Sequence, residues 1–375
     1  MTGAKARRST AIVAVAAAIA LLAGCAGGAS ADGDAGAQPD LSQLEPAADP
    51  RSIVGPSTAV MPDDEIEVVA EDPGQQLPAT VTSYAQSGDE EQMTVAATDR
   101  VVAVDLAGSI AATAWALGFG DTLVGIDQST TFPGTEGIEQ VTSGGHTINA
   151  EAVIGLDPDV VITDGTVGPR DVIEQLRDVG ITVVFVDNDP SLEGAQDLAR
   201  QVAAVYGAPE VGEQLAEHIA DDVAATAAEI ARLVPEDESD RVRMVFLYLR
   251  GNAGVYYMFG EESGADELIE SLGGIDVAAE LGWEGMRPMT DEALLAADPD
   301  LILTMTGGIE STGGIDGLLQ EKPAVALTAA GQNERIVDMD DGTILSFGPR
   351  SADVIEALAR AVYAPDNAHA GEAAE

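Results

Sequence analysis

The sequence has very little positive charge. Its 375 residues include 17 lysines and arginines against 65 aspartates and glutamates, which gives a formal net charge of -48 at pH 7. Such a surface repels phosphate backbones, so the composition argues against a nucleic-acid partner. The acidic excess fits either a salty habitat or a simple need for solubility, because net charge governs association and solubility rather than fold. The composition does not choose between these two explanations.

Cysteine and histidine are almost absent. The one cysteine, Cys25, excludes an internal disulfide, and the three histidines are His146, His218 and His369. His218 falls in a long helical stretch and His369 in a polar tail, where we assign them structural or solvated roles. A free metal ion needs three or four convergent histidine, cysteine or carboxylate ligands. The one remaining histidine therefore argues against a metallohydrolase.

An apolar run near the start of the chain, residues 11–22, is too short for a good membrane span. Lys5, Arg7 and Arg8 precede it and small residues follow, which is typical of a secretory signal. The run ends in Leu-Ala-Gly-Cys25, which resembles the lipobox of bacterial lipoproteins, where cleavage precedes a cysteine that becomes lipidated. We predict a signal peptide over residues 1–24 and a lipid anchor on Cys25, at the extracytoplasmic face of the cell membrane. The alternative is an incidental thiol.

The segment that follows Cys25 has the composition of a linker. It has no aromatic residue and carries eleven aspartates or glutamates against one arginine, with several prolines. Low hydrophobicity and high net charge favour disorder. We therefore predict a disordered acidic tether over residues 25–77, which would let a globular domain search the space above the membrane.

Twelve residues of the remaining chain occur twice. Glu151-Ala-Val-Ile-Gly-Leu-Asp-Pro-Asp-Val-Val-Ile162 and Glu292-Ala-Leu-Leu-Ala-Ala-Asp-Pro-Asp-Leu-Ile-Leu303 keep the glutamate, the Asp-Pro-Asp and the apolar run at the same spacings. Each copy predicts a helix, a turn before proline, and a strand buried on both faces. A unit used twice predicts two similar lobes, against the alternative that this short pattern arises by chance in an α/β protein.

The order of apolar runs predicts where each lobe begins and ends. Residues 78–190 open with a hairpin near 80–82 and 93–95 and then alternate strands and helices, as in a parallel sheet with crossover helices. Its strands are expected at 101–104, 123–126, up to 163, and 182–186, and its helices at 110–117 and 172–179. Residues 236–365 form the second lobe, with strands at 242–250 and 336–339 and helices at 260–272 and 354–362. A polar tail, 366–375, closes the chain.

Between the lobes, residues 191–235 are predicted to be helical. The stretch 213–234 has no glycine or proline, and its 22 residues would span roughly 33 Å, enough to cross a domain. Leu215, Ile219, Val223 and Ile230 give it one apolar face, so we expect a rigid brace across both lobes. A solvated coiled-coil arm is the alternative, but no sustained heptad supports it.

One strand of the second lobe ends in two chemically useful residues. Tyr248 and Arg250 are two positions apart, so both side chains lie on one face of the 242–250 strand at its carboxyl end. Ligands of open α/β sheets bind at this edge. His146, on the first lobe, lies in a glycine-flanked loop ahead of the first repeat. Taken alone it is an ordinary loop residue, but together with Tyr248 and Arg250 it suggests a ligand site.

These motifs resemble a known family. Two lobes, a helical brace, a lipoprotein signal and the repeated unit look like the substrate-binding proteins of bacterial ABC importers, in the class that carries vitamin B12, siderophores and heme. Within that class the chain is most similar to hemin-binding lipoproteins, through Phe132-Pro133, Gly145-His146-x-x-Asn149-Ala150-Glu151, Tyr248-x-Arg250 and Phe347-Gly348-Pro349-Arg350. The resemblance implies an α/β fold of two similar Rossmann-like lobes joined by a long rigid helix, with the ligand cleft between them.

The resemblance also implies a function and a site. The protein would bind heme as a transported ligand, with His146 and Tyr248 as axial ligands of the iron and Arg250 supporting the tyrosine. Its partners would be heme and an ABC permease dimer, and it would be a monomer or weak dimer and no enzyme. The chemistry agrees, because a phenol ionises at about pH 10 and needs a nearby positive charge to bind iron as phenolate at neutral pH.

A porphyrin is a flat apolar disc with two carboxylates, so its walls should be aliphatic, aromatic or thioether side chains. The candidates are Tyr256, Tyr257, Met258, Met286, Met289 and Met305, each of which fits core packing equally well. Arg350 is a candidate for a heme propionate, with a plain salt bridge as the alternative.

Glu151 and Glu292 begin the two repeated helices. Acidic residues in a first turn favour the helix dipole, which is one explanation of both. The resemblance adds another, because in this class a surface glutamate on each lobe docks onto arginines of the permease.

Two other functions are weighed against heme delivery. The first is a binding protein for a siderophore or a corrinoid, with Tyr248 and Arg250 as hydrogen-bonding groups. The second is an enzyme such as a heme peroxidase, which is disfavoured because a His/Tyr pair on both axial positions leaves iron no open site for peroxide. An absorption spectrum with added hemin discriminates among these functions.

Overall fold

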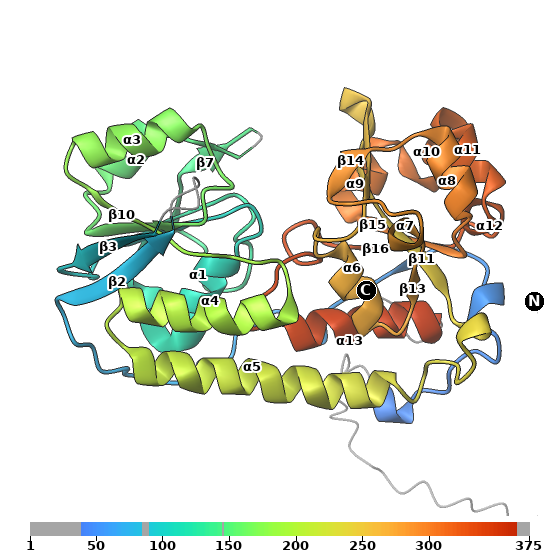
Figure 1. Ribbon diagram of the computed structural model, residues 1–375, viewed down its shortest axis with the longest axis horizontal. Helices are drawn as coiled ribbons and strands as arrows, with labels where there is room; N and C mark the ends of the chain where they lie inside the picture. Colours follow the sequence, from blue (N-terminus) through green and yellow to red (C-terminus); the bar gives the residue numbers. More distant parts are fainter. Residues whose placement is uncertain (1–38, 85–89, 145, 366–375) are drawn as a thin grey trace, which may run out of the picture. The chain divides into compact units, whose positions relative to one another are not determined.

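The computed structural model describes residues 39–84, 90–144 and 146–365. The predicted signal peptide, Cys25 and the polar tail lie outside the described residues. Two sheets, one in each lobe, carry the fold (Figure 1). Within the described ranges, no helix combines the length and the apolar character needed to cross a membrane.

The sheet of the first lobe is parallel throughout. Its order is β10-β9-β4-β5-β6, and every neighbouring pair is parallel. The strands are β4 (Val101–Val104), β5 (Leu123–Ile126), β6 (Glu139–Gln140), β9 (Val160–Thr163) and β10 (Thr182–Phe185). All four residues of β4 and of β9 are buried, as expected for β-branched runs covered on both faces.

Helices cover both faces of this sheet. One face packs on α1 (Ser109–Ala114), the π-helical turn η3 (Trp115–Phe119) and α4 (Leu192–Val205), and the other on α2 (Ala150–Gly155) and α3 (Arg170–Asp178). A short 3-10 turn, η4 (Gly120–Thr122), leads into β5. The predicted hairpin is confirmed as β2 (Ala79–Tyr84) paired antiparallel with β3 (Glu90–Val95). A second, shorter antiparallel pair is β7 (Thr142–Ser143) with β8 (Thr147–Ile148).

The sheet of the second lobe is mixed. Its order is β1-β16-β15-β11-β12-β14, with β13 paired to β11. The strands are β1 (Ser57–Thr58), β11 (Arg243–Arg250), β12 (Val255–Phe259), β13 (Ile275–Asp276), β14 (Met286–Pro288), β15 (Leu301–Met305) and β16 (Ile336–Met339). The pairs β11/β12 and β12/β14 are antiparallel and the others are parallel. The strands β12 and β14 were not predicted from the sequence.

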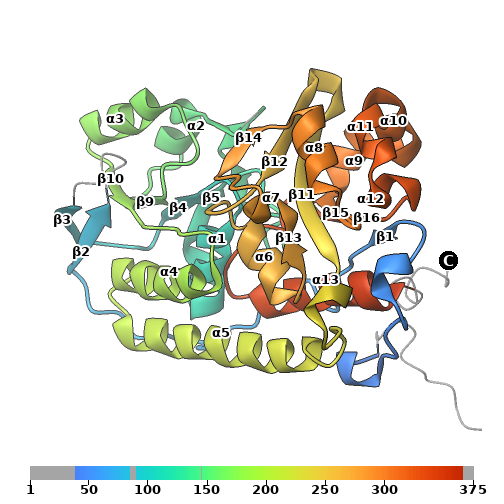
Figure 2. The same ribbon diagram turned by 45° about the vertical axis from the view of Figure 1, so that its right-hand side comes forward.

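Two helical layers sandwich this second sheet (Figure 2). One face packs on α6 (Ala265–Ser271) and α13 (Ser351–Tyr363). The opposite face packs on α7 (Val277–Glu280), α8 (Asp291–Ala297), α10 (Gly314–Glu321) and α11 (Pro323–Leu327). The remaining helices are α9 (Thr306–Ser311) and α12 (Ala329–Gln332), and the 3-10 turns are η1 (Leu41–Gln43), η2 (Pro50–Ser52), η5 (Glu238–Asp240) and η6 (Gly251–Ala253).

The predicted brace is confirmed as α5 (Pro209–Ile230), a helix of 22 residues that packs against α4 and α13 (Figure 1). Leu215 and Ile219 are buried in the core of the first lobe, whereas Ile230 is buried in that of the second. Val223, between them, packs against both. The apolar face of one helix therefore belongs to both lobes.

The repeated unit has the same contacts in both lobes. Asp157, just after the C-cap of α2, and Asp298, the C-cap of α8, have positive φ angles of 48° and 39°. The following aspartate exchanges two hydrogen bonds with an arginine at the start of the neighbouring strand: the backbone N–H of Asp159 donates to the Arg100 carbonyl at 2.8 Å, and the Arg100 N–H donates to the Asp159 carboxylate at 2.9 Å.

The second lobe repeats this arrangement. The Asp300 N–H donates to the Arg243 carbonyl at 2.8 Å, and the Arg243 N–H to the Asp300 carboxylate at 3.1 Å. Each arginine side chain also donates to a carbonyl at the end of the repeated helix, Leu156 in one lobe and Ala297 in the other. The repeat is therefore a structural unit and not a chance pattern.

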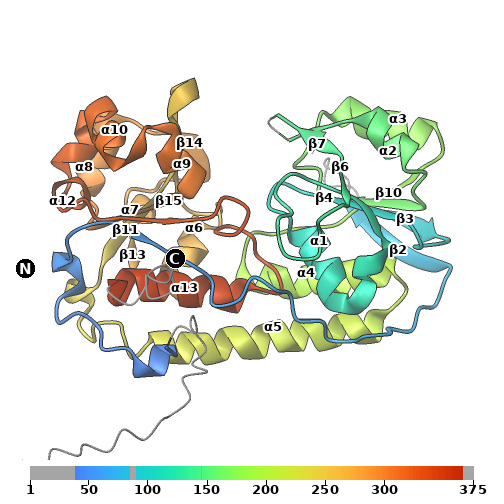
Figure 3. The ribbon, with the colours of Figure 1, turned by 180° about the vertical axis from the view of Figure 1, so that it is seen from behind.

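The predicted tether is wrong for residues 39–77. Figure 3 shows this segment following the back of both lobes, and its β1 pairs in parallel with β16. Leu41, Leu44 and Met61 are buried in the core of the second lobe, and Ile66 is buried in that of the first. The average composition concealed these spaced apolar side chains, each of which occupies a site in a core. Residues 39–77 therefore belong to the folded domain.

Candidate functional site

His146 lies in the turn between β7 and β8, in the left-handed region with φ of 61°. Its carbonyl accepts a hydrogen bond from the backbone N–H of Gly168 at 3.2 Å, which holds the turn. The ring is half-buried, and its Nδ1 is buried without a hydrogen-bond partner among the described residues. Burial lowers the pKa of His146 below its usual range, and the positive charge of Arg250 lowers it further. A neutral imidazole is a suitable iron ligand.

Gln128, which the sequence analysis missed, is the neighbour of this ring. Its side-chain nitrogen lies 3.2 Å from Nε2 of His146. Its backbone N–H donates to the Thr142 hydroxyl at 2.8 Å, which ties the turn after β5 to the strand that leads to His146. No sequence motif marks this glutamine, because the two residues are 18 positions apart and meet only in the fold.

Tyr248 and Arg250 lie together at the end of β11. Cζ of Arg250 is 4.4 Å from the centroid of the Tyr248 ring, so the guanidinium stacks over the phenol. Nη2 of Arg250 donates to Oδ2 of Asp341 at 2.9 Å, and Nη1 donates to the Leu249 carbonyl at 2.8 Å. Arg250 and Asp341 are each about one-third exposed, at 33% and 36%. Asp341, a second residue absent from the sequence-based set, fixes the arginine over the tyrosine.

The structure brings the histidine of one lobe near the Tyr-Arg pair of the other. The charge of Arg250 acts on His146, which requires the two side chains to be within electrostatic reach. Tyr248, on the same strand face as Arg250, belongs to the same site. Arg250 therefore lies within electrostatic range of His146, and the binding of one iron atom by His146 and Tyr248 stays a prediction.

Only half of the wall candidates lie on the Tyr248 face of the sheet. Tyr257 is directly opposite Tyr248 on β12, and Met305 packs with both against the second core. Met286 is opposite Phe259 on β14 and is 55% exposed. These three side chains lie on the Tyr248 face of the sheet, where they remain candidates for the walls of the ligand site.

The other three candidates, Tyr256, Met258 and Met289, pack into the core on the opposite face. Met258 is fully buried there. The Tyr256 hydroxyl donates to Glu321 at 2.6 Å, and burial together with that carboxylate raises the pKa of Tyr256 to about 12. Side chains alternate across β12, so two adjacent tyrosines have different environments. The assignment of these three residues to the ligand walls is therefore wrong.

Arg350 lies at the start of α13 and is 8% exposed. Its Cζ lies 5.6 Å from the centroid of the Phe132 ring of the first lobe, and its Nη1 donates to the Asp64 carbonyl at 3.4 Å. Burial lowers the pKa of Arg350. It forms no ion pair among the described residues, so the salt-bridge interpretation is wrong, whereas the propionate role stays a prediction.

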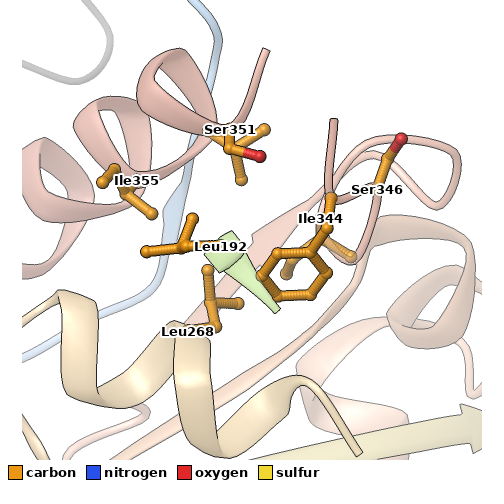
Figure 4. A pocket seen from close by; sticks show the side chains of 8 residues that line it. Leu192, Leu268, Ile344, Ser346, Ser351 and Ile355 are labelled. Carbon is orange, nitrogen blue, oxygen red and sulfur yellow. The ribbon is translucent and has the colours of Figure 1, made fainter. Parts of the chain in front are cut away.

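A small apolar pocket lies beside this contact (Figure 4). The residues that line it are Leu192, Leu268, Ile344, Ser346, Phe347, Ser351, Val354 and Ile355. Its cavity volume is about 10 Å³, which is roughly the space that one water molecule needs. This pocket is therefore not the site for a porphyrin.

Glu151 and Glu292 occupy equivalent, exposed positions in the first turns of α2 and α8. The preceding residues, Asn149 and Thr290, cap the two helices through their side chains. Neither glutamate forms an ion pair within the described part of the chain.

His218 has carboxylate neighbours of its own. His218, on α5, lies 3.3 Å from Asp222 and 3.8 Å from Glu67, and His369 lies outside the described residues. Among the described residues, no group of three or more histidines, cysteines or carboxylates is arranged to hold a metal ion.

Comparisons with known proteins agree with this architecture. The model of the periplasmic binding protein family matches residues 101–343. The crystal structure of the heme-binding protein HmuT is similar with a TM-score of 0.78 and 38% identity, covering 84% of this chain and 99% of that one. Further HmuT structures are variants in which a histidine, a tyrosine or an arginine is replaced by alanine.

Two curated relatives are more distant. The ABC transporter substrate-binding lipoprotein YvrC of Bacillus subtilis is 28% identical over 67% of this chain and 76% of its own length. A cobalamin-binding protein of Halobacterium salinarum is 28% identical over 69% of each.

Proposed function

Because this chain belongs to the periplasmic binding protein family, we propose that it captures hemin between its two lobes and delivers it to the permease of an ABC importer. The prediction that it is a substrate-binding protein and not an enzyme is confirmed by its relatives. The family relationship also confirms the two-lobed α/β fold.

The arrangement of His146, Tyr248 and Arg250 supports hemin as the ligand. His146 offers an imidazole whose pKa is lowered, and Arg250 on the other lobe contributes to that lowering. The three HmuT variants replace a histidine, a tyrosine and an arginine, and that tyrosine and arginine are two positions apart, as Tyr248 and Arg250 are. Both sets contain the same three residue types.

The role of each side chain follows from its chemistry. Ferric heme accepts an imidazole nitrogen on one side and a phenolate oxygen on the other, so His146 and Tyr248 bind the iron from opposite lobes. Arg250 favours the phenolate through its positive charge, although the carboxylate of Asp341 offsets part of that charge. Tyr257, Met286 and Met305 supply apolar contact to the porphyrin from the Tyr248 face of the sheet.

A corrinoid is the second candidate ligand, because the Halobacterium relative is a cobalamin-binding protein. A corrinoid binder uses Tyr248 and Arg250 as hydrogen-bonding groups and requires no phenolate. A ferric siderophore fits the same two residues in the same way. Coordination of iron by the Tyr248 phenolate is therefore expected for hemin and not for the other two ligands.

Membrane attachment and permease docking complete the proposal. Cys25 carries a lipid that holds the protein at the extracytoplasmic face of the membrane, as the lipoprotein relative YvrC suggests. Glu151 and Glu292 dock onto the two permease subunits, supported by their equivalent exposed positions in the two lobes. Charges at the rim of an interface steer association more than they fix affinity.

Spectroscopic titration tests the proposed ligand. Hemin added to the wild-type protein should give a shifted Soret band with a phenolate-to-iron band. His146→Ala and Tyr248→Ala should each lose one ligand, and Tyr248→Ala alone should lose the phenolate band. Cobalamin is titrated in parallel. If hemin stays free in solution while cobalamin binds, the cargo is a corrinoid and not hemin.

A further inference from the structure

Two short turns, one in each lobe, connect the proposed iron ligands to a contact between the lobes. The first turn comprises residues 127–129 and follows β5. The second comprises residues 340–342 and follows β16. In both, an aspartate accepts hydrogen bonds from backbone N–H groups later in the turn. The next side chain contacts His146 in the first turn and Arg250, which supports Tyr248, in the second. The third residue of each turn contacts the other turn.

The first turn holds His146. The carboxylate of Asp127 is buried and accepts from the backbone N–H groups of Ser129 at 2.7 Å and Thr130 at 3.0 Å. Its other oxygen accepts from the N–H of Asp105 at 3.2 Å, which fixes the turn to β4. Gln128, between these groups, therefore has a fixed backbone from which its amide contacts the ring of His146 at 3.2 Å.

The second turn holds Arg250 over Tyr248. Oδ1 of Asp340 accepts from the backbone N–H of Gly342 at 3.0 Å. Asp341 uses one carboxylate oxygen for Arg250 at 2.9 Å and the other for the backbone N–H of Gly307 at 2.7 Å. The position of the guanidinium over the tyrosine thus depends on this turn.

The third residues of the two turns meet at close range. A Cβ atom on Gly342 would lie 2.6 Å from the carbonyl oxygen of Ser129 and 3.2 Å from the hydroxyl of Thr131. Gly342 is not in the left-handed region, so a side chain there is opposed by space and not by the φ angle. A second contact joins the lobes nearby, where the hydroxyls of Ser109 and Ser346 are 3.3 Å apart.

We propose that the contact between Gly342 and the Ser129 carbonyl sets the spacing between His146 and Tyr248, and that Gln128 and Asp341 are positioning residues that transmit this spacing to the ligands. The inference rests on the proposed function, because it concerns the geometry of the same iron site. Two axial ligands from separate lobes can bind one iron atom only if the distance between them is held within a fraction of an ångström. A contact that fixes the distance between the lobes meets this requirement.

Gly342→Ala tests the contact without altering either ligand. Ordinary contact with a Cβ begins at 3.4 Å, so the added methyl must displace the Ser129 carbonyl by about 0.8 Å from its 2.6 Å approach. We expect hemin affinity to fall about tenfold or more, which is the effect of losing one charge-assisted interaction with a ligand. Absorption and resonance Raman spectra should change from two protein ligands to one.

The control variant is Gly155→Ala, which adds the same methyl where no atom lies within 4 Å. It should keep the wild-type spectrum, and thermal melting checks that both variants are folded. A double variant adds His146→Ala to Gly342→Ala. If the contact acts through ligand spacing, the two effects are not additive, because the second change removes a ligand already disengaged.

A cross-link tests the spacing even if Gly342→Ala does not fold. Ser109→Cys with Ser346→Cys, in a Cys25→Ser background, should form a disulfide on oxidation that locks the lobes at the separation seen here. The oxidised protein should bind hemin with both ligands, as the reduced one does. Failure of the disulfide to form, or loss of one ligand on locking, overturns the inference.

Failure of the inference and failure of the proposed function have different signatures. If wild-type protein does not coordinate hemin through two residues, the proposed function fails. If it does, and folded Gly342→Ala gives the same spectrum and affinity as Gly155→Ala, the spacing contact alone is refuted.

Discussion

Leu41→Ala is the sharpest test of whether residues 39–77 belong to the folded domain. Leu41 is 2% exposed and contributes to the core of the second lobe, although the composition of its segment is that of a linker. Truncating a fully buried leucine removes its transfer free energy and leaves a cavity, which costs about 2–5 kcal/mol. The lower half of that range is expected here, because the short turn η1 relaxes more readily than a central strand.

Val54→Ala is the matched control, since Val54 belongs to the same segment and is 72% exposed. A surface substitution of this kind changes the free energy of unfolding by less than about 0.5 kcal/mol. Urea unfolding of both variants, followed by circular dichroism without hemin, gives the two values. If the urea midpoints of the two variants are equal and their slopes are unchanged, Leu41 does not pack in the core. Residues 39–77 would then be a tether, as the composition predicts.

Three further predictions concern the site and its partners. Burial and, to a smaller extent, the charge of Arg250 lower the pKa of His146. In Arg250→Ala the imidazole should therefore take up a proton at a higher pH, and acid should release hemin at a higher pH than in wild type. Equal pH midpoints of hemin release would contradict this coupling. Cys25→Ser should release the protein from membranes while hemin titrations stay unchanged, and continued membrane retention would exclude lipid anchoring. Glu151→Ala with Glu292→Ala should slow heme transfer to a reconstituted permease, most clearly at low salt, with an unchanged Soret band and melting temperature; wild-type transfer rates would leave only the helix-dipole explanation.

Elements with strong local patterns were predicted well. The strands Val101–Val104, Leu123–Ile126 and Ile336–Met339 have the predicted bounds, because short, largely apolar runs between turn residues leave few alternatives. The two Asp-Pro-Asp turns were recognised for the same reason. Their arginine partners were not, since Arg100 and Arg243 lie 59 and 57 residues from the aspartates that they pair with.

Errors occurred where the environment of a residue depends on distant parts of the chain. Tyr256 and Tyr257 are neighbours with equal propensities, but the register of β12 against β11 sends one to the core and the other toward Tyr248. The composition of residues 39–77 predicted a tether. In the structure, β1 pairs with β16 and four buried side chains pack in the cores of the two lobes, so the segment belongs to the fold.

The sequence by itself determined the two lobes, the helix that braces them, and the three residues of the candidate iron site. These features depend on local periodicity, a duplicated unit and residue types with distinctive chemistry. Only the tertiary structure decided that Gln128 contacts His146, that Asp341 holds Arg250, and that Gly342 meets the Ser129 carbonyl. Those contacts join residues 18, 91 and 213 positions apart, and no local pattern encodes them, because they result from how the turns pack within each lobe and how the two lobes pack on a shared helix.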